Sequence, residues 1–246
     1  LDLRSVTYTM VSFCSLIMSA FHTDYIKPCP KSDSECLKKT IQEVLPLFTQ
    51  GIPSIGVNSL DPMEQKSVNI ELPGGLKIVF KDGVVKGFKT CKVDSAKYND
   101  LNVDINMHCD LTIKGKYTAQ GNILIVSING DGDAKIKLRN FIPISANLGL
   151  KIKYVLEDKT QNGVVYRTLK DHKVTTSYDG RVSFTFTNLF KGNPELSQAV
   201  LTFLNENWKQ LVEEFGKPIE DVIIKGTIRN IKKFFESVPR DELFVA

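Results

Sequence analysis

Hydrophobic residues recur along the chain with two different spacings, one typical of β-strands and one typical of helices. From residue 67 to residue 190, apolar and polar positions alternate, which is typical of β-strands with one buried face. The clearest run covers residues 101–113, where every odd position is apolar and every even position is polar. Shorter alternating runs lie at residues 134–138, 150–154 and 182–186. These patterns predict long strands with one apolar and one solvated face.

Turn dipeptides fall between the alternating runs, where hairpins need them. The predicted turns are Pro73-Gly74, Asp82-Gly83, Asn129-Gly130, Asn162-Gly163 and Asp179-Gly180. Together with the runs they predict a meandering antiparallel sheet.

Residues 193–239 have a helical period instead. Asn193 is a suitable N-cap, and Pro194 fits the first helical position. The apolar positions cover more than the one stripe of a surface helix, so this segment needs a large partner. Gly216 and Pro218 interrupt the pattern, which leaves open one kinked helix or two; we favour one kinked helix, about 60 Å long. The predicted fold is α+β, with a highly curved antiparallel sheet wrapped around this helix.

A shorter helix is predicted at residues 33–50, with Asp33 as N-cap and Gly51 as C-cap. Pro46 lies in its last turns and favours a bend or an early end. The next segment, residues 51–63, is apolar but interrupted by proline and glycine, which favours an extended connector.

The first 22 residues are interpreted as a signal peptide. Residues 10–20 form an apolar run too short to span a bilayer. Translation from Met10 and an ordinary N-terminal helix are the alternatives left open. The interpretation predicts a secreted, extracellular protein in which residues 23–246 form a single hydrophobic-ligand-binding domain.

An oxidising compartment would favour disulfides. Cys29 and Cys36 are the best candidates because they enclose a short loop. Cys91 and Cys109 would face each other in a hairpin centred on Asp100, so a cross-strand disulfide and two buried thiols both remain open.

Charge and motifs exclude several function classes. The net charge of +4 comes without a lysine–arginine block, which argues against nucleic-acid binding, and no exposed apolar or basic patch is evident. His108 and His172 lack metal-ligand partners at suitable spacing. Residues 129–133 resemble a calcium loop but fail at Lys135. No nucleophile elbow or nucleotide-binding motif occurs. We therefore expect a binding protein without catalytic residues, metal or cofactor.

Four separated motifs carry a family resemblance. They are Cys29 and Cys36 before a helix, GIPSIGVNSLDP at residues 51–62, FLNENWKQLVEEFGKPIED at residues 203–221, and FFESVPRDELF at residues 234–244. In this order they resemble the insect takeout and juvenile hormone binding protein family. The resemblance implies a secreted carrier with a tunnel between sheet and C-terminal helix, and a Cys29–Cys36 disulfide. No cysteine follows Cys109, whereas the hormone-binding proteins proper have a second bridge toward their C-terminal half. This difference favours the takeout-like branch.

The predicted function is transport of an elongated hydrophobic ligand, such as a fatty acyl, isoprenoid or juvenile-hormone-like lipid, by a monomer without stable membrane insertion. The alternatives are a membrane- or receptor-docking signalling protein and, less favoured, an ester hydrolase. Tyr154 is expected to orient a polar ligand head at the tunnel mouth. The predicted ligand-binding residues are Ile105, Met107, Leu111, Ile136, Leu138, Ile152, Tyr154, Phe184 and Phe186 from the sheet, and Val200, Phe203, Leu204 and Leu211 from the helix.

Overall fold

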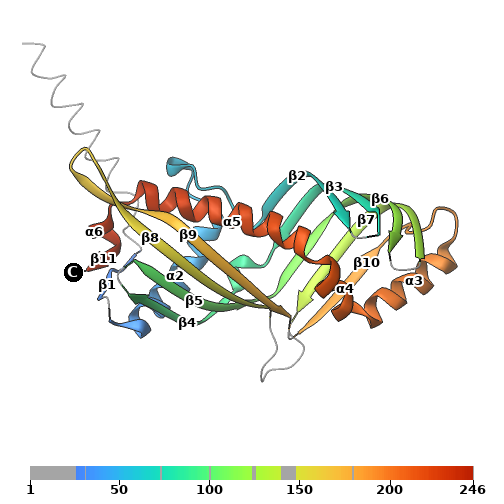
Figure 1. Ribbon diagram of the computed structural model, residues 1–246, viewed down its shortest axis with the longest axis horizontal. Coiled ribbons are helices and arrows are strands. Elements are labelled where there is room, and N and C mark those ends of the chain that lie inside the picture. Colours follow the sequence, from blue (N-terminus) through green and yellow to red (C-terminus); the bar gives the residue numbers. More distant parts are fainter. Residues whose placement is uncertain are drawn as a thin grey trace, which may run out of the picture.

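The computed structural model describes residues 26–30, 32–72, 74–99, 101–123, 126–139, 148–178 and 180–245. The predicted signal peptide, residues 1–22, lies outside these ranges. The described chain forms an elongated molecule in which two antiparallel sheets follow one another along the long axis (Figure 1). Helices lie along the edges of both sheets. The predicted α+β fold with a curved antiparallel sheet and a long C-terminal helical region is confirmed.

The prediction of a single meandering sheet is wrong in one respect, because the strands divide between two sheets. The five-stranded sheet has the order β10 (Arg181–Phe186), β7 (Val126–Arg139), β6 (Leu111–Ile123), β3 (Leu76–Lys86) and β2 (Met63–Leu72). The four-stranded sheet has the order β4 (Lys92–Asn99), β5 (Asn102–Cys109), β8 (Leu148–Gln161) and β9 (Val164–Tyr178).

The run at residues 101–113, predicted as one strand, crosses from one sheet to the other at Asp110, between β5 and β6. Its apolar alternation continues through Asp110, so the pattern could not reveal the crossing. Gly87 marks the close approach at this junction. It has a φ of 121°, and a Cβ there would lie 2.0 Å from the carbonyl oxygen of Asp110.

Two of the predicted turns are hairpin turns: Gly74 lies between β2 and β3, and Asn162-Gly163 lies between β8 and β9. Asp82-Gly83 is instead part of a bulge inside β3, and Asn129-Gly130 lies inside β7. Gly130 is needed there because a Cβ would lie 2.5 Å from the carbonyl oxygen of Leu189, in the segment that crosses the strand. Gly180 precedes a strand of the other sheet, and Asp179 lies outside the described residues.

The N-terminal helix has the predicted caps, but the early end considered at Pro46 does not occur. α2 (Ser34–Gln50) begins after Asp33, whose side chain accepts a hydrogen bond from the Cys36 amide at 2.9 Å, and it continues through Pro46 to Gly51. The segment that follows is compact and not extended, since η1 (Pro53–Ile55) folds it back on itself.

The C-terminal region consists of α3 (Pro194–Glu206), α4 (Trp208–Phe215), α5 (Lys217–Ser237) and α6 (Arg240–Leu243). Gly216 keeps helical angles, with φ −71° and ψ −32°, and its amide donates to the Val212 carbonyl at 2.9 Å. The predicted kink at this position is confirmed. A second bend, at Asn207, separates α3 from α4 and was not predicted. The region therefore changes direction (Figure 1), and the predicted single kinked helix is divided further, at Asn207.

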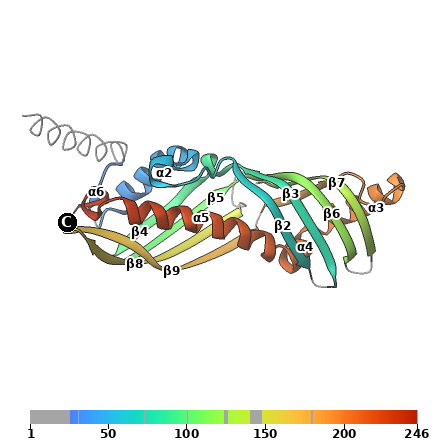
Figure 2. The ribbon, with the colours of Figure 1, turned by 90° about the horizontal axis from the view of Figure 1, so that it is seen from above.

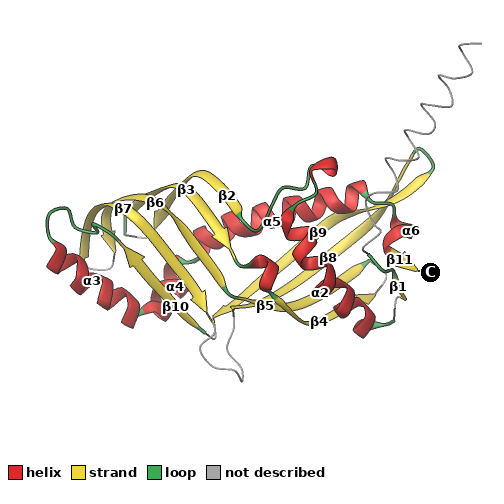
Figure 3. Ribbon diagram, turned by 180° about the vertical axis from the view of Figure 1, so that it is seen from behind, coloured by secondary structure: helices red, strands yellow, loops and turns green. Residues whose placement is uncertain are grey.

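The helices close the edges of the sheets. α5 contacts β9 and β2, which are edge strands of different sheets, while α2 contacts β4, and α3 and α4 contact β10 (Figures 2 and 3). The long helix therefore spans the opening between two sheets and is not enclosed by one sheet. At the far end, β1 (Cys29–Pro30) pairs in parallel with β11 (Phe244–Val245).

Candidate functional site

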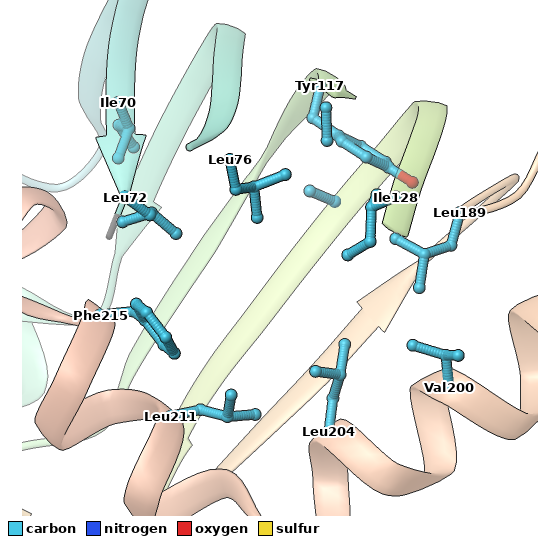
Figure 4. Close-up of a cluster of buried hydrophobic side chains, with 12 residues drawn as sticks. Ile70, Leu72, Leu76, Tyr117, Ile128, Leu189, Val200, Leu204, Leu211 and Phe215 are labelled. Carbon is cyan, nitrogen blue, oxygen red and sulfur yellow. The ribbon is translucent and has the colours of Figure 1, made fainter. Parts of the chain in front are cut away.

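A cavity of about 480 Å³ runs between the inner faces of both sheets and the helices. Leu76, Ile128 and Leu189 line it at the end formed by the five-stranded sheet, where strand and helix side chains point toward one another (Figure 4). Leu37 and Leu243 line it at the end where β1 and β11 pair. The cavity therefore follows the long axis of the molecule, and its wall is almost entirely apolar.

Most of the residues predicted to bind ligand lie on this wall. The structure places eleven of them there: Ile105, Met107, Leu111, Ile136, Leu138, Ile152, Tyr154, Phe184, Phe186, Leu204 and Leu211. Val200 is buried in the cluster of Figure 4 without lining the cavity. Phe203 is wrongly predicted, since its side chain is 40% exposed. Successive helical residues differ by about 100° around the axis, so Leu204 faces inward and Phe203 does not.

Two groups of lining residues were not predicted, although both have the helical period that could have revealed them. α5 contributes Ile219, Val222, Ile223, Ile224, Ile228, Ile231, Phe234 and Phe235. α2 contributes Leu37, Ile41, Val44, Leu45 and Phe48. Both helices present apolar residues to the cavity and charged residues such as Lys39 and Lys225 to solvent.

Glu220 is a polar exception in this wall. It lies in the first turn of α5, directly after the kink at Gly216. The Thr176 hydroxyl donates to one of its carboxylate oxygens at 2.8 Å, and the Tyr178 hydroxyl donates to the other. All three side chains line the cavity. Burial, followed by the hydrogen bond to Glu220, raises the pKa of Tyr178, so its hydroxyl remains a donor.

Tyr154 was expected at an opening, but it is buried, with 4% of its surface exposed. Burial raises the pKa of its phenol well above the usual range. Its hydroxyl has no hydrogen-bond partner among the described residues. Tyr117 differs because its hydroxyl donates to the Thr187 carbonyl at 2.8 Å, and burial together with Asp131 raises its pKa to about 12.

Two disulfides fix the walls. One joins Cys29 of β1 to Cys36 of α2. The other joins Cys91 to Cys109, whose Cα atoms are 4.3 Å apart, and so ties the start of β4 to the end of β5. The second bridge lies next to the crossing between the sheets, and both bonds belong to the cavity boundary.

A network of charged groups holds the end of the chain at the β1–β11 pair. Asp158 accepts hydrogen bonds from Arg167 Nε and from Arg240 Nη1, each at 3.1 Å. Arg167 is 5% exposed, and its guanidinium also donates to the Tyr98 hydroxyl. Because Arg240 belongs to α6, the network attaches this helix to the β8–β9 hairpin.

The described residues offer no cluster of metal ligands. Within the described ranges, no group of three or more histidine, cysteine, aspartate or glutamate side chains is arranged to hold a metal. His108 pairs with Asp94 on the outer surface at 2.8 Å. No helix of the described chain combines the length and apolarity needed to cross a membrane.

Known proteins resemble this chain in sequence and fold. Takeout 1 of Epiphyas postvittana superposes with a TM-score of 0.83 at 37% identity, covering 90% of this chain and all of that one. The circadian clock-controlled protein daywake of Drosophila yakuba is 27% identical over 236 residues, 90% of this chain and 87% of its own length. A putative beta-carotene-binding protein of Schistocerca gregaria is 24% identical over 219 residues, 85% of this chain and 82% of its own. The model of the haemolymph juvenile hormone binding protein family matches residues 8–245, and the chain belongs to this family.

Proposed function

We propose that this protein is a secreted carrier that binds an elongated apolar ligand in the cavity between the sheets and the helices. The observation that carries the proposal is the cavity itself, whose apolar wall runs from Leu76 at one end to Leu243 at the other. Its volume of about 480 Å³ lies in the usual range for small-molecule sites.

Burial of apolar surface supplies the binding energy. At about 25 cal/mol per Å², a ligand that buries several hundred Å² gains many kcal/mol before the entropic cost of association. Few polar contacts are needed, so specificity depends mainly on length and shape. A fatty acyl or isoprenoid chain fits this description, and the name of the Schistocerca relative, a putative beta-carotene-binding protein, points to a ligand of the same class.

Glu220 restricts the polar group that such a ligand can carry. Each carboxylate oxygen has more than one acceptor position, so one remains on each after the bonds from Thr176 and Tyr178. A ligand hydroxyl placed there donates to the carboxylate, whereas a ligand carboxylate is repelled by it. We therefore favour neutral lipids and alcohols over free fatty acids.

The test is organic extraction of the protein secreted by insect cells, followed by mass spectrometry. A co-purifying apolar compound in near-stoichiometric amount is the expected result. Ile152→Trp, which fills the cavity, should reduce the recovered compound. Lys151→Trp, on the exposed face of the same strand, should not. If no apolar compound is recovered and a panel of lipids fails to bind, the carrier function is wrong.

A further inference from the structure

The outer face of the five-stranded sheet carries a dense group of cationic side chains. Here β3, β6, β7 and β10 turn their apolar residues to the cavity and the alternate positions outward. The basic face consists of Lys81, Lys86, Lys114, Lys116, Lys135, Lys137, Arg139 and Arg181. The strand register sets three like-charged pairs directly opposite each other: Lys81 and Lys116, Lys114 and Lys135, and Arg139 and Arg181.

This arrangement works against stability. Like charges directly opposite each other on neighbouring strands repel and destabilise the sheet. The pKa of Lys135 is lowered, chiefly by the charge of Lys137 and also by partial burial and the charge of Arg139. Among the described residues of the basic face, Lys116 has an acidic partner, Asp133, which lies opposite it and contacts its ammonium at 2.5 Å. Asp131, at the next outward position of β7, lies opposite Thr118 and contacts Lys191 at 3.2 Å. On the edge strand β2, Glu71 lies opposite Lys77 and Glu64 lies opposite Val84.

The four-stranded sheet also has a like-charged pair on its outer face, Lys153 opposite Lys173, but there an acid lies beside it. On its outer face Asp104 lies opposite Lys97 on one side and opposite Lys153 on the other, and it contacts the Lys153 ammonium at 3.4 Å. His108 likewise pairs with Asp94. Opposite charges on neighbouring strands can therefore pair in this fold. Their scarcity on the basic face calls for a functional reason.

The basic face corrects the expectation that no basic patch exists. Its cationic residues are distributed over four strands, and on β6 and β7 they alternate with glycine or apolar residues, so no run of positive residues occurs in the sequence. Only the register of the strands brings them together.

We propose that the basic face docks the protein on lipid bilayers that expose anionic phospholipids. The cations extend across several strands in two dimensions, which suits a planar array of headgroups better than one linear polyanion. Most are lysines, which act as hydrated point charges and not as bidentate phosphate clamps. On β6, the outward positions on either side of the two lysines are Thr112 and Thr118. The outer face of this strand therefore offers no aromatic side chain on which a nucleic-acid base could stack. Docking would bring the cavity next to a membrane that can supply or receive apolar ligands. The docking proposal itself does not depend on which ligand the cavity binds.

The experiment is flotation of the purified protein with phosphatidylcholine vesicles, with and without phosphatidylserine. Binding is expected only to the anionic vesicles, and it should weaken steeply as salt is raised. The combined variant Lys114→Gln, Lys135→Gln and Lys137→Gln should lower the partition coefficient about fivefold for each charge removed. A matched control removes three exposed lysines of the β8–β9 hairpin, Lys159→Gln, Lys170→Gln and Lys173→Gln, and should retain at least half the binding.

Thermal unfolding separates lost binding from lost structure. Because repulsion is relieved, the Lys114, Lys135 and Lys137 variant should unfold at the same or a higher temperature than the parent protein. Equal binding to neutral vesicles, or an equal loss in both triple variants, would overturn the proposal. So would retention on a sulfated polysaccharide without vesicle binding, which would assign the face to a linear polyanion.

Discussion

The hydroxyl of Thr176 on β9 lies 2.8 Å from a carboxylate oxygen of Glu220 on α5, inside a wall that is otherwise almost wholly apolar. With Tyr178 on the second oxygen, this contact fastens the start of α5 to the edge of the four-stranded sheet. The same three groups are also the polar surface that a ligand meets at the kink of the helical region.

Glu220→Gln should change which ligands bind. The parent protein is expected to bind a long-chain alcohol more tightly than the carboxylic acid of the same chain length. A hydrogen bond to a charged group contributes about 1 kcal/mol more than a neutral one, and glutamine keeps one acceptor oxygen, so alcohol binding should weaken about fivefold. Displacement of a fluorescent lipid probe measures both affinities.

The matched control for this prediction is Glu213→Gln, an exposed carboxylate on α4. It should leave both affinities unchanged. Equal affinities of alcohol and acid in the parent protein would contradict the role given to Glu220, while the carrier function would still stand.

Adjacent residues on α3 test the inner face of the helix. Leu204 is 5% exposed and lines the cavity, whereas Phe203 is 40% exposed. Leu204→Ala should destabilise the protein by about 2–5 kcal/mol, as large-to-small core substitutions do, and Phe203→Ala by much less. Chemical denaturation gives both values, and similar losses in the two variants would show that the assigned face is wrong.

The Cys91–Cys109 disulfide should stabilise the junction between the sheets. Its sequence separation of 18 residues corresponds to about 3 kcal/mol of loop-closure entropy in the unfolded chain. The double variant Cys91→Ser and Cys109→Ser should lose stability of this order. Guanidinium unfolding measures it, with the reduced parent protein as a comparison; an unchanged midpoint would argue against the bridge.

Buried tyrosines should make the protein sensitive to alkali. Tyrosine in an unfolded chain ionises near pH 10, whereas the pKa of Tyr117 in the folded protein is raised to about 12. Between these values the unfolded state has lost a proton that the folded state retains, so stability falls as pH rises. The effect is absent below pH 10 and complete above pH 12.

Absorbance at 295 nm follows this titration. The native protein should not ionise Tyr117, Tyr154 or Tyr178 near pH 10, although unfolded protein should ionise all its tyrosines there. In Tyr117→Phe, stability should fall less steeply between pH 10 and 12. A single midpoint near pH 10 for every tyrosine of the native protein would contradict the prediction.

The strands and the inner face of the sheets could be predicted because alternation assigns each residue to a side. Ile105, Ile136 and Ile152 line the cavity as expected, although they belong to three strands. Alternation does not state which strands pair. The alternation of apolar and polar residues continues unchanged across Asp110, where the chain passes from one sheet to the other. The separation into two sheets could therefore not be predicted from the sequence.

The helices were harder to place. Asn193 and Asp33 predicted where helices begin, because a cap acts locally through its own side chain. The bend at Asn207 has no proline or glycine at that position to predict it, and the two helices on either side of it, α3 and α4, both contact β10. Glu220 was missed because one carboxylate in an apolar helix is ordinary in sequence and acquires meaning only when Thr176 and Tyr178 are opposite it.

The parallel pairing of β1 with β11 has a consequence for the kinetics of ligand exchange. This ladder is two residues long, whereas the sides of the cavity are closed by strands of up to 15 residues. Short units with few hydrogen bonds open locally at a fraction of the global unfolding free energy. A ligand that leaves past Cys29 and Leu243 requires only a local opening of this ladder and not separation of the sheets. Its exchange rate should therefore follow amide hydrogen exchange in the ladder. It should not depend on the stability of the two sheets.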